Sequence, residues 1–230
     1  MTDPAAIVDA AITTRRSVRA FLPTKVARAT VEEILDVAAR APSGTNMQPW
    51  RVHAMAGGAL KAFCDRVEGD FLAGGVGQQR EYKYYPDEFF EPYLSRRRQV
   101  GFAMYDLLDI RRGETEKMKL QHARNFRFFD APVGIICTIE KRLNVGSWLD
   151  YGFFLGNICA AARGRGLDTI PQAAFASLPD SVRAALGLTE QTGIVCGVAI
   201  GYADRDATVN QLCTPRAPAS EFTHFTGFTG

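Results

Sequence analysis

The most informative stretch of the chain is Pro42-Ser43-Gly44-Thr45-Asn46-Met47-Gln48-Pro49-Trp50. Prolines bracket it, and a hydroxyl and two carboxamides lie between them, at Ser43, Asn46 and Gln48. A carboxamide presents a hydrogen-bond donor and an acceptor side by side, which matches the edge of a planar heterocycle. An Asx-turn that joins a helix to a strand is the alternative interpretation of the same residues. The stretch therefore predicts a loop with either a binding or a connecting role.

Strands are predicted from short apolar runs on both sides of this loop. One follows it directly, over Arg51–Ala56. Two β-branched runs, Pro132–Ile139 and Ile194–Ile200, contain no charged residue, which is typical of central strands buried on both faces. A shorter strand is predicted over Asp168–Ile170. Since no repeat or linker stands out, we expect a single domain over residues 1–230.

Helices are predicted from apolar stripes and from residues that start or stop a helix. Asp3-Pro4 is an N-cap and first-turn pair ahead of a helical stripe. Thr30-Val31-Glu32-Glu33 predicts a capping box at the start of a second helix, which Pro42 ends. Trp148–Gly166 is rich in Phe, Ala and Gly, which predicts an apolar helix buried all round, and Pro179–Leu186 predicts a short helix closed by the following glycine.

Two regions break this regular pattern. Residues 70–112 are predicted to form a lid and a long-helix insertion, in which the irregular excursion Gly74–Pro92 precedes a basic helix over about Pro92–Arg112. The tail, about residues 205–230, contains two prolines and ends in a phenylalanine cluster without regular period. A tail with that much apolar surface is expected to dock on another surface. The aromatic residues concerned are Tyr82, Tyr84, Tyr85, Phe89 and Phe90 in the excursion, and Phe222, Phe225 and Phe228 in the tail.

The composition argues against several classes of protein. The 230 residues carry 27 Lys and Arg against 25 Asp and Glu, a formal charge of +2, whereas a nucleic-acid binder needs a clustered basic excess. No stretch reaches the ~20 apolar residues of a bilayer helix, and no secretory signal is visible. The five cysteines and three histidines lack the spacing of a metal site. We therefore expect a cytoplasmic protein with reduced thiols and without a metal, nucleic-acid or membrane partner.

Three further segments carry candidate binding residues. Arg15-Arg16-Ser17-Val18-Arg19 offers three guanidiniums and a hydroxyl, which suit a phosphate dianion, although a basic end to the preceding helix is the alternative. Pro171-Gln172-Ala173-Ala174-Phe175 has small side chains that let backbone N–H groups approach a flat ligand. Arg216 is a lone cation in a proline-containing tail, where a plain surface role is the alternative.

The order and spacing of these segments resemble those of the flavin-dependent nitroreductase family over nearly the whole chain. The resemblance rests on Arg-Arg-Ser-Val-Arg at 15–19, Pro-Ser-Gly-Thr-Asn-Met-Gln-Pro-Trp at 42–50, Phe-Asp-Ala-Pro-Val at 129–133, Pro-Gln-Ala-Ala-Phe at 171–175, Gly-Tyr-Ala-Asp at 201–204, and Arg216. It implies an α+β fold in which helices surround a central sheet. It also implies a C-terminal extension exchanged in an intertwined homodimer, with FMN at the interface.

The same resemblance implies which residues hold FMN. The phosphate would be bound by Arg15, Ser17, Arg19 and Arg216, with Arg16 close by. The other subunit would place Ser43 and Asn46 at the flavin ring, with Gln48 shaping that loop. Backbone N–H groups near Ala173 and Ala174 would reach the flavin N5.

One segment departs from the family pattern. Some relatives carry an asparagine and a lysine ahead of the Asp-Ala-Pro strand, and the ungapped match places Arg124 and Arg127 there. A one-residue shift would place Asn125 at the ring instead. Both matches stay open at this point.

The reaction that the resemblance implies needs no acid or base from the protein, so no catalytic residue is assigned. NAD(P)H would pass hydride to the flavin, and a small nitroaromatic or quinone would then take up two electrons. One alternative is an FMN enzyme of the same fold with other chemistry, such as reductive dehalogenation, flavin fragmentation or enone reduction. Another is a flavin-binding module without enzyme activity.

Substrate contacts are predicted at Phe89, Phe90 and Phe126. Aromatic walls favour stacking of flat, electron-poor rings, and the glycines of the excursion would let such a wall move. The alternative is that these aromatic side chains only pack the excursion against the long basic helix.

Overall fold

The structure, a computed structural model, describes residues 3–75 and 79–228. Its described strands form one antiparallel sheet in the order β1-β2-β4-β3. The strands span Arg51–Ala56 (β1), Val133–Glu140 (β2), Asp168–Gln172 (β3) and Thr192–Gly201 (β4). All of the predicted strands are confirmed, and β1 has the predicted bounds. Part of the predicted excursion, residues 76–78, lies outside the described residues, as do residues 1–2 and 229–230.

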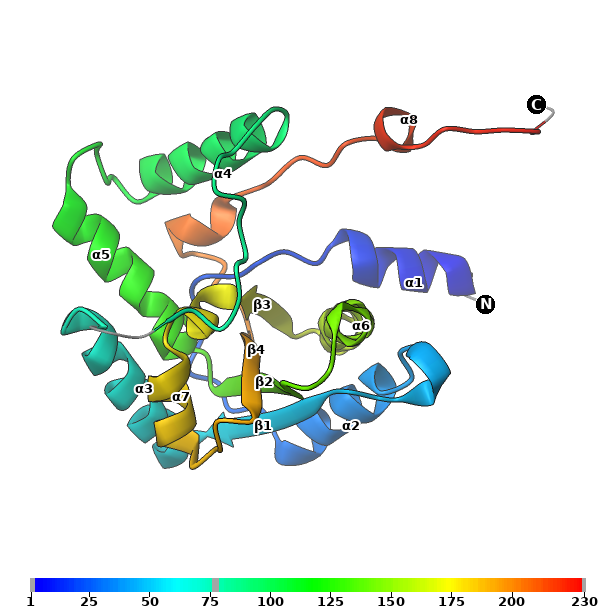
Figure 1. Cartoon of the computed structure of the whole chain (residues 1–230). Coiled ribbons are helices and arrows are strands. Elements are labelled where there is room, and N and C mark those ends of the chain that lie inside the picture. Colours follow the sequence, from blue (N-terminus) through cyan, green and yellow to red (C-terminus); the bar gives the residue numbers. More distant parts are fainter. Residues whose placement is uncertain (1–2, 76–78, 229–230) are drawn as a thin grey trace.

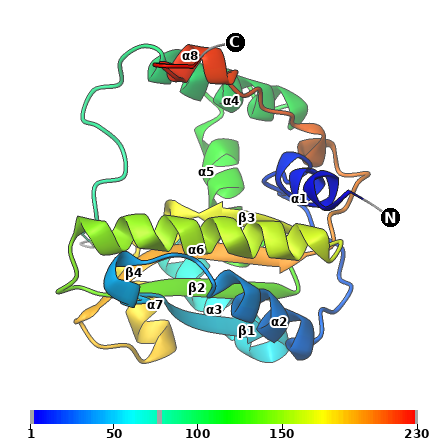
Figure 2. The same ribbon diagram turned by 90° about the vertical axis from the view of Figure 1, so that its right-hand side faces the viewer.

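Two layers of helix cover the sheet. On one face pack α2 (Arg28–Ala38) and the long α6 (Val145–Gly164). On the other face pack α3 (Gly57–Leu72), α7 (Pro179–Leu186) and two short 3-10 segments, η2 (Arg124–Asp130) and η3 (Ala173–Ser177). Figure 2 shows α6 running across the sheet, with α3 and α7 behind it.

The central strands are buried on both faces, as their uncharged sequences predict. Residues Val133–Ile139 of β2 are all buried, and so are residues 193–201 of β4. Side chains alternate between the layers, because Ile135 and Cys137 join the α2–α6 side while Ile136 joins the α3–α7 side. The sheet therefore joins two hydrophobic cores.

Three helix predictions can be compared with the structure in detail. The first helix, α1 (Pro4–Thr13), is confirmed, and Asp3 caps it by accepting a 3.0 Å hydrogen bond from the Ala5 N–H. The capping box at Thr30 is wrong, because α2 already begins at Arg28 and Ala27 is its N-cap. An ion pair of 2.7 Å between Arg28 and Glu32 supports that earlier first turn.

The prediction that the Trp148–Gly166 helix is buried all round is wrong for the single chain. One face of α6 packs on the sheet, but Val145, Leu149 and Phe153 on the other face are 84%, 66% and 46% exposed. The apolar stripe of α1 is open in the same way, with Ile7 and Val8 both 57% exposed. Two neighbouring helices of the single chain therefore expose apolar side chains.

Two helices of the structure were not predicted from the sequence. In α3 the residues Leu60, Phe63, Cys64 and Val67 are buried at helical spacing, a stripe that periodicity could have found. The other is α5 (Thr115–Ala123), which buries Ala123 alone and therefore carries almost no apolar signal.

A second group of elements lies apart from the sheet. Figure 1 shows α4 (Tyr93–Leu107), α5 and the C-terminal tail on one side of the molecule, with the tail extending away from it. The predicted basic helix over Pro92–Arg112 is confirmed as α4, which begins one residue later, at Tyr93, and ends earlier, at Leu107. The tail contains η4 (Thr208–Gln211) and a short α8 (Ala219–Phe222). None of the described helices combines the length and the apolarity needed to cross a bilayer.

Glycines in the central strands make room for two aromatic rings. Phe128 of η2 and Phe175 of η3 stack with their centroids 4.6 Å apart, and both rings lie against Gly197 of β4. A Cβ atom at Gly197 would lie 2.4 Å from the Phe175 ring. The glycine therefore sets how closely η2 and η3 approach the sheet.

We expect Gly197→Ala to destabilise the protein, because the Phe175 ring and η3 must move to admit the new methyl group. The expected loss in the free energy of unfolding is about 1–3 kcal/mol, measured by chemical denaturation. Gly69→Ala is the matched control, because a Cβ there meets nothing within 4 Å. In that exposed helical position alanine should stabilise by roughly 0.5–1 kcal/mol. A Gly197→Ala protein as stable as the wild type would contradict this packing.

Candidate functional site

A cavity of about 1250 Å³ lies between three segments that are distant in the sequence. They are residues 12–19 at the end of α1, residues 96–100 of α4, and residues 212–221 of the tail. Its described lining holds five arginines and a single carboxylate, that of Glu221; the arginines are Arg15, Arg16, Arg19, Arg96 and Arg216. The structure thus brings together the predicted residues Arg15, Arg16, Ser17, Arg19 and Arg216.

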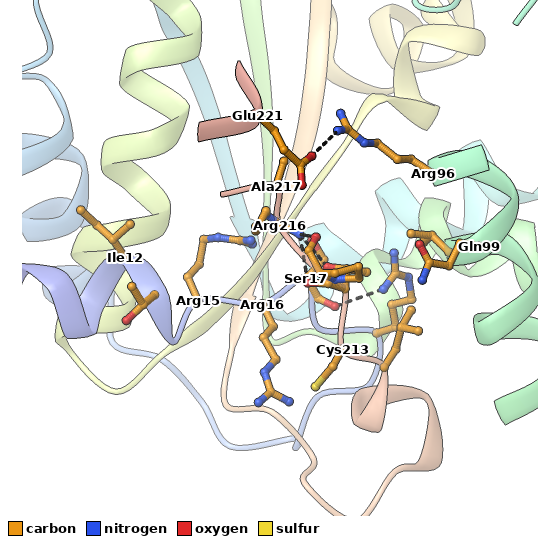
Figure 3. A pocket seen from close by; sticks show the side chains of 16 residues that line it. Ile12, Arg15, Arg16, Ser17, Arg96, Gln99, Cys213, Arg216, Ala217 and Glu221 are labelled. Carbon is orange, nitrogen blue, oxygen red and sulfur yellow. Dashed lines mark hydrogen bonds and ion pairs between the residues drawn. The ribbon is translucent and has the colours of Figure 1, made fainter. Parts of the chain in front are cut away.

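The arginine segment is held against the edge of the sheet. The Val18 N–H donates a 3.2 Å hydrogen bond to the Thr169 carbonyl of β3, beside a parallel bridge between Ser17 and Thr169. Alternate residues of an extended segment share a face, so Arg15, Ser17 and Arg19 point one way while Val18 enters the core. In Figure 3 Arg15 extends toward Arg216, whereas Arg16 extends away from both.

Asn210 of η4 fixes the end of this segment. Its Oδ1 accepts a 2.7 Å hydrogen bond from the Arg19 N–H, and its Nδ2 donates to the Ala20 carbonyl at 2.8 Å. Nδ2 also donates to the Asp204 carbonyl at 2.7 Å. Asn210 was not predicted as a functional residue, because no local sequence pattern marks an asparagine that binds a segment 190 residues away.

Arg163 of α6 fixes the beginning of the segment. Its Nε donates to the Thr14 Oγ1 at 2.9 Å, and its Nη1 pairs with the Asp168 carboxylate at 3.0 Å. The Asp168 side chain is only 9% exposed, so removing one partner of this pair is expected to cost about 3–5 kcal/mol. Arg163 therefore ties α6, β3 and the start of the arginine segment together.

The cavity is electropositive. Burial lowers the pKa of Arg19, yet the guanidinium stays cationic near neutral pH, because arginine side chains remain protonated in proteins. Its guanidinium donates to a backbone carbonyl, that of Ser17 at 3.2 Å, and Arg216 likewise bonds to Thr214 and Pro215 of its own segment. Since neither guanidinium is bound to a carboxylate in these contacts, both are available for an anion. This donor set fits a phosphate group.

The predicted ring-side loop is compact and lies away from this cavity. The Ser43 hydroxyl accepts a 3.1 Å hydrogen bond from the Gln48 N–H, and the Gln48 amide donates to the Asn46 carbonyl. Thr45, Asn46 and Gln48 all have positive φ values, of 48°, 60° and 49°. Non-glycine residues in that region carry strain, which is common at functional sites. Within one chain this loop does not join the arginine cavity.

Two contacts anchor the loop from below. The Gly44 N–H donates to the Asp150 carboxylate of α6 at 3.1 Å. Trp50 stacks on Phe154 of the same helix, with centroids 4.8 Å apart and the planes 5° from parallel. Asn46 and Gln48 remain exposed above this base, so their side chains face outward.

The half-buried Ala173 and Ala174 follow β3 directly. Ser17 lies beside Thr169 at the other end of this strand. Four residues of extended chain span about 13 Å. The strand therefore sets the distance between the arginine cavity and η3.

The three remaining candidates, Arg124, Asn125 and Arg127, lie in η2 between α5 and β2 and differ in their contacts. Arg127 pairs with Asp65 and Glu68 of α3 at 3.2 and 2.9 Å, and Arg124 pairs with Asp130 at 3.0 Å. Carboxylates thus compensate both arginines. The Asn125 carbonyl instead accepts a 2.7 Å hydrogen bond from the Gln172 side chain, which links η2 to the strand that leads into η3.

The substrate-contact prediction for Phe126 is wrong in the described structure. Its side chain is 0% exposed and packs against Phe71 and Phe175 in the core under η2. Phe90, in contrast, is 60% exposed. Phe89 lies under the Arg97 guanidinium of α4, 4.6 Å from ring centroid to guanidinium carbon, which matches the packing alternative.

Residues 81 and 82 of the excursion are anchored to the body of the protein. The buried Glu81 carboxylate pairs with Arg183 of α7 at 2.5 Å and with Lys141 at 3.0 Å. The Tyr82 hydroxyl donates to the Val195 carbonyl of β4 at 2.7 Å. Movement of the excursion would therefore begin after Tyr82.

The antiparallel sheet between two helical layers is the arrangement that this chain shares with solved structures. The chain belongs to the nitroreductase family, whose model, described as "Nitroreductase family", matches residues 12–202. This membership confirms the family resemblance and the fold class that the motifs predicted.

Several relatives are similar over nearly their whole length. A 4-nitrobenzoate reductase of Pseudomonas putida is 41% identical over 223 residues, 96% of each chain. The FMN and NADPH-dependent nitroreductase NfnB of Sphingopyxis sp. strain HMH superposes with a TM-score of 0.92 at 36% identity, covering 96% of this chain and 99% of its own. The FMN-dependent nitroreductase NfnB of Mycobacterium smegmatis, solved in complex with NADPH, has a TM-score of 0.92 at 30% identity, covering 97% and 100%.

Proposed function

We propose that this chain is an FMN-dependent oxidoreductase that uses NAD(P)H to reduce nitroaromatic or quinone substrates. The observation that carries the proposal is the arginine cavity, held by β3 at a fixed distance from η3. The FMN and NADPH-dependent relatives and the 4-nitrobenzoate reductase support it. The free thiols, of which Cys64, Cys137, Cys159 and Cys196 are buried, support a cytoplasmic location.

The residues of the cavity fit the phosphate of FMN. Arg15, Ser17, Arg19 and Arg216 would bind it through charge-assisted hydrogen bonds, while Arg16 adds positive charge from the opposite face. When bound, FMN supplies a two-electron carrier between NAD(P)H and the oxidant. The small side chains of Ala173 and Ala174 leave their backbone N–H groups open toward the ring.

At the other side of the ring we place Asn125 rather than Arg124 or Arg127. Both arginines are compensated by carboxylates, whereas Asn125 is neutral and is positioned by Gln172. The left-handed residues Phe128 and Phe129, with φ values of 50° and 53°, turn the chain directly after this point. No residue of this chain is assigned as an acid or base, because orientation and charge are what the proposed reaction asks of the protein.

For the oxidant we propose the exposed Phe90 as a contact, with Phe89 at its margin. Phe90 is 60% exposed and meets Tyr93 edge-on at 5.1 Å, which gives a wall of aromatic surface. Flat nitroaromatic rings stack well on such a wall. Phe89 contributes less, because Arg97 already covers its ring.

We also propose that the working form is a homodimer in which each chain completes the other's site. The phosphate residues and the loop with Ser43, Asn46 and Gln48 lie apart within one chain, and a second copy would supply the loop. Exposed apolar side chains on α1, α6 and the tail offer surface for that copy; in the tail they are Phe222, Phe225 and Phe228, at 72%, 60% and 79% exposure. A twofold dimer covers both copies of such surfaces at once.

The proposed activity is tested by anaerobic stopped-flow spectroscopy of the purified protein. It should be yellow, release FMN on denaturation, lose its visible flavin absorbance with NAD(P)H and regain it with 4-nitrobenzoate. Halophenols and enones serve as comparison oxidants for the other chemistries of this fold. Release of mainly FAD, or reduction without reoxidation by any nitroarene or quinone, would overturn the proposal.

We expect Arg19→Ala to weaken FMN binding without unfolding the protein, because it removes a charge-assisted contact to the phosphate. The expected cost is about 1.5–3 kcal/mol, or roughly 10- to 150-fold in Kd. Fluorescence titration of the apoprotein measures it. Arg28→Ala is the matched control, because Arg28 lies outside the cavity and pairs with Glu32 at the surface. An unchanged Kd for FMN would contradict phosphate binding by Arg19 and favour the alternative that residues 15–19 only form a basic end to the preceding helix.

We expect deletion of the residues after Ala219 to disrupt the dimer, because it removes the phenylalanine cluster of the tail. Size-exclusion chromatography with light scattering should then show monomers or aggregates that retain little flavin. Thr226→Ala is the control, because it changes a residue of the tail without removing an aromatic ring. A truncated protein that elutes as a flavin-loaded dimer would contradict the role of the tail.

A further inference from the structure

The cavity holds more positive charge than one phosphate requires. FMN brings a phosphate of about −2, and Arg15, Arg19 and Arg216 together with Ser17 offer it a complete set of donors. Arg96 is a further guanidinium that comes from a different element, α4. In Figure 3 Arg96 and Glu221 lie apart from Arg15, Ser17 and Arg216. A second anion can therefore bind without displacing the first.

Arg96 is held only loosely. Its Nη2 lies 3.8 Å from the Glu221 carboxylate, and the two side chains are 55% and 58% exposed. An exposed pair at that distance contributes little and can exchange partners. Its neighbours on α4 are engaged elsewhere, because Arg97 stacks over Phe89 and Arg98 lines a separate cavity of about 810 Å³. Arg96 shares its helix face with Gln99 and Val100, which also line the arginine cavity.

We propose that Arg96 binds the 2′-phosphate of NADPH, with Glu221 as the carboxylate that it exchanges for that phosphate. This inference rests on the proposed function, and it makes Arg96 a residue that selects NADPH over NADH. A phosphate monoester carries about −1.5 to −2 charges and competes with a carboxylate for a guanidinium. Each phosphate of the dinucleotide's diphosphate carries about one charge and competes less well.

The position of Arg96 also favours the far end of the dinucleotide. Figure 1 shows α4 outside the sheet and its helical layers, on the side from which the tail leaves. A nicotinamide placed at η3 leaves the adenosine end to extend outward, toward such an exposed residue. Glu221 lies 3.8 Å from Arg96, so its negative charge competes with a bound phosphate until the two side chains separate.

The test is isothermal titration calorimetry of NADP⁺ and NAD⁺ into the oxidised, FMN-loaded protein. Neither nucleotide can reduce the flavin, so the measurement reports binding alone. NADP⁺ should bind about tenfold more tightly than NAD⁺, as one charge-assisted contact predicts. Arg96→Ala should remove that difference and leave the Kd for NAD⁺ and the FMN content unchanged.

Two further variants sharpen the result. Glu221→Gln should tighten NADP⁺ binding about two- to fivefold, because the competing charge is gone. Arg98→Ala is the matched control, since it removes an arginine from the same helix but from the other cavity, and it should change neither Kd.

Equal losses for both nucleotides in Arg96→Ala would overturn the inference in favour of a diphosphate contact. Loss of FMN in Arg96→Ala would overturn it by placing Arg96 at the flavin phosphate. Failure of the proposed function looks different, because the wild-type holoprotein would then not be reduced by either NADPH or NADH.

Discussion

The attachment of residues 17–22 to the edge of the sheet is the constraint on which the site depends. Backbone hydrogen bonds from Val18 to Thr169 and from Leu22 to Tyr202 fix both ends of the segment, at 3.2 and 2.8 Å. Val18 and Phe21 are buried, and burying each such side chain contributes about 1.5–3 kcal/mol. Because these residues enter the core, the alternate residues Ser17 and Arg19 must face the cavity. Packing thus orients the polar groups that are proposed to bind the phosphate.

The second constraint is the close contact of η2 and η3 with the central strands. Glycine at position 197 lets the Phe175 and Phe128 rings lie directly on β4, and Gln172 then joins the two segments through the Asn125 carbonyl. The segments proposed to surround the flavin ring are therefore supported by the hydrophobic core, which keeps them rigid. Rigid support of this kind is what a site that works by orientation requires.

The described chain also leaves much apolar surface open. The exposed faces of α1 and α6 and the tail beyond α8 are separate in sequence, and each would be costly to leave in water. The strained loop at Thr45–Gln48 lies on the same side of the sheet as α6. It is held there by the hydrogen bond from Gly44 to Asp150 of α6 and by the stacking of Trp50 on Phe154. The proposed site divided between two copies of the chain would account for both features, and it would couple assembly to cofactor binding.

Local patterns in the sequence determined the parts of this protein that depend on neighbours along the chain. The uncharged runs of β2 and β4, the N-cap at Asp3, the bounds of β1 and α7, and the cationic segment at 15–19 could all be predicted, because each depends on residues a few positions apart. Family motifs added the fold, since they keep a fixed order over the whole chain.

Only the tertiary structure decided which side chains meet across the chain. Phe126 has the same aromatic character as Phe90, yet Phe126 is fully buried and Phe90 is 60% exposed, because η2 packs into the hydrophobic core and the end of the excursion does not. No local sequence pattern marks Arg96 or Asn210 as part of the site. The family match suggests Arg127 as a flavin contact, but the structure pairs Arg127 with Asp65 and Glu68. Sequence periodicity predicts the face of the helix or strand on which a residue lies. Which side chain it contacts there depends on the packing of segments as much as 190 residues apart.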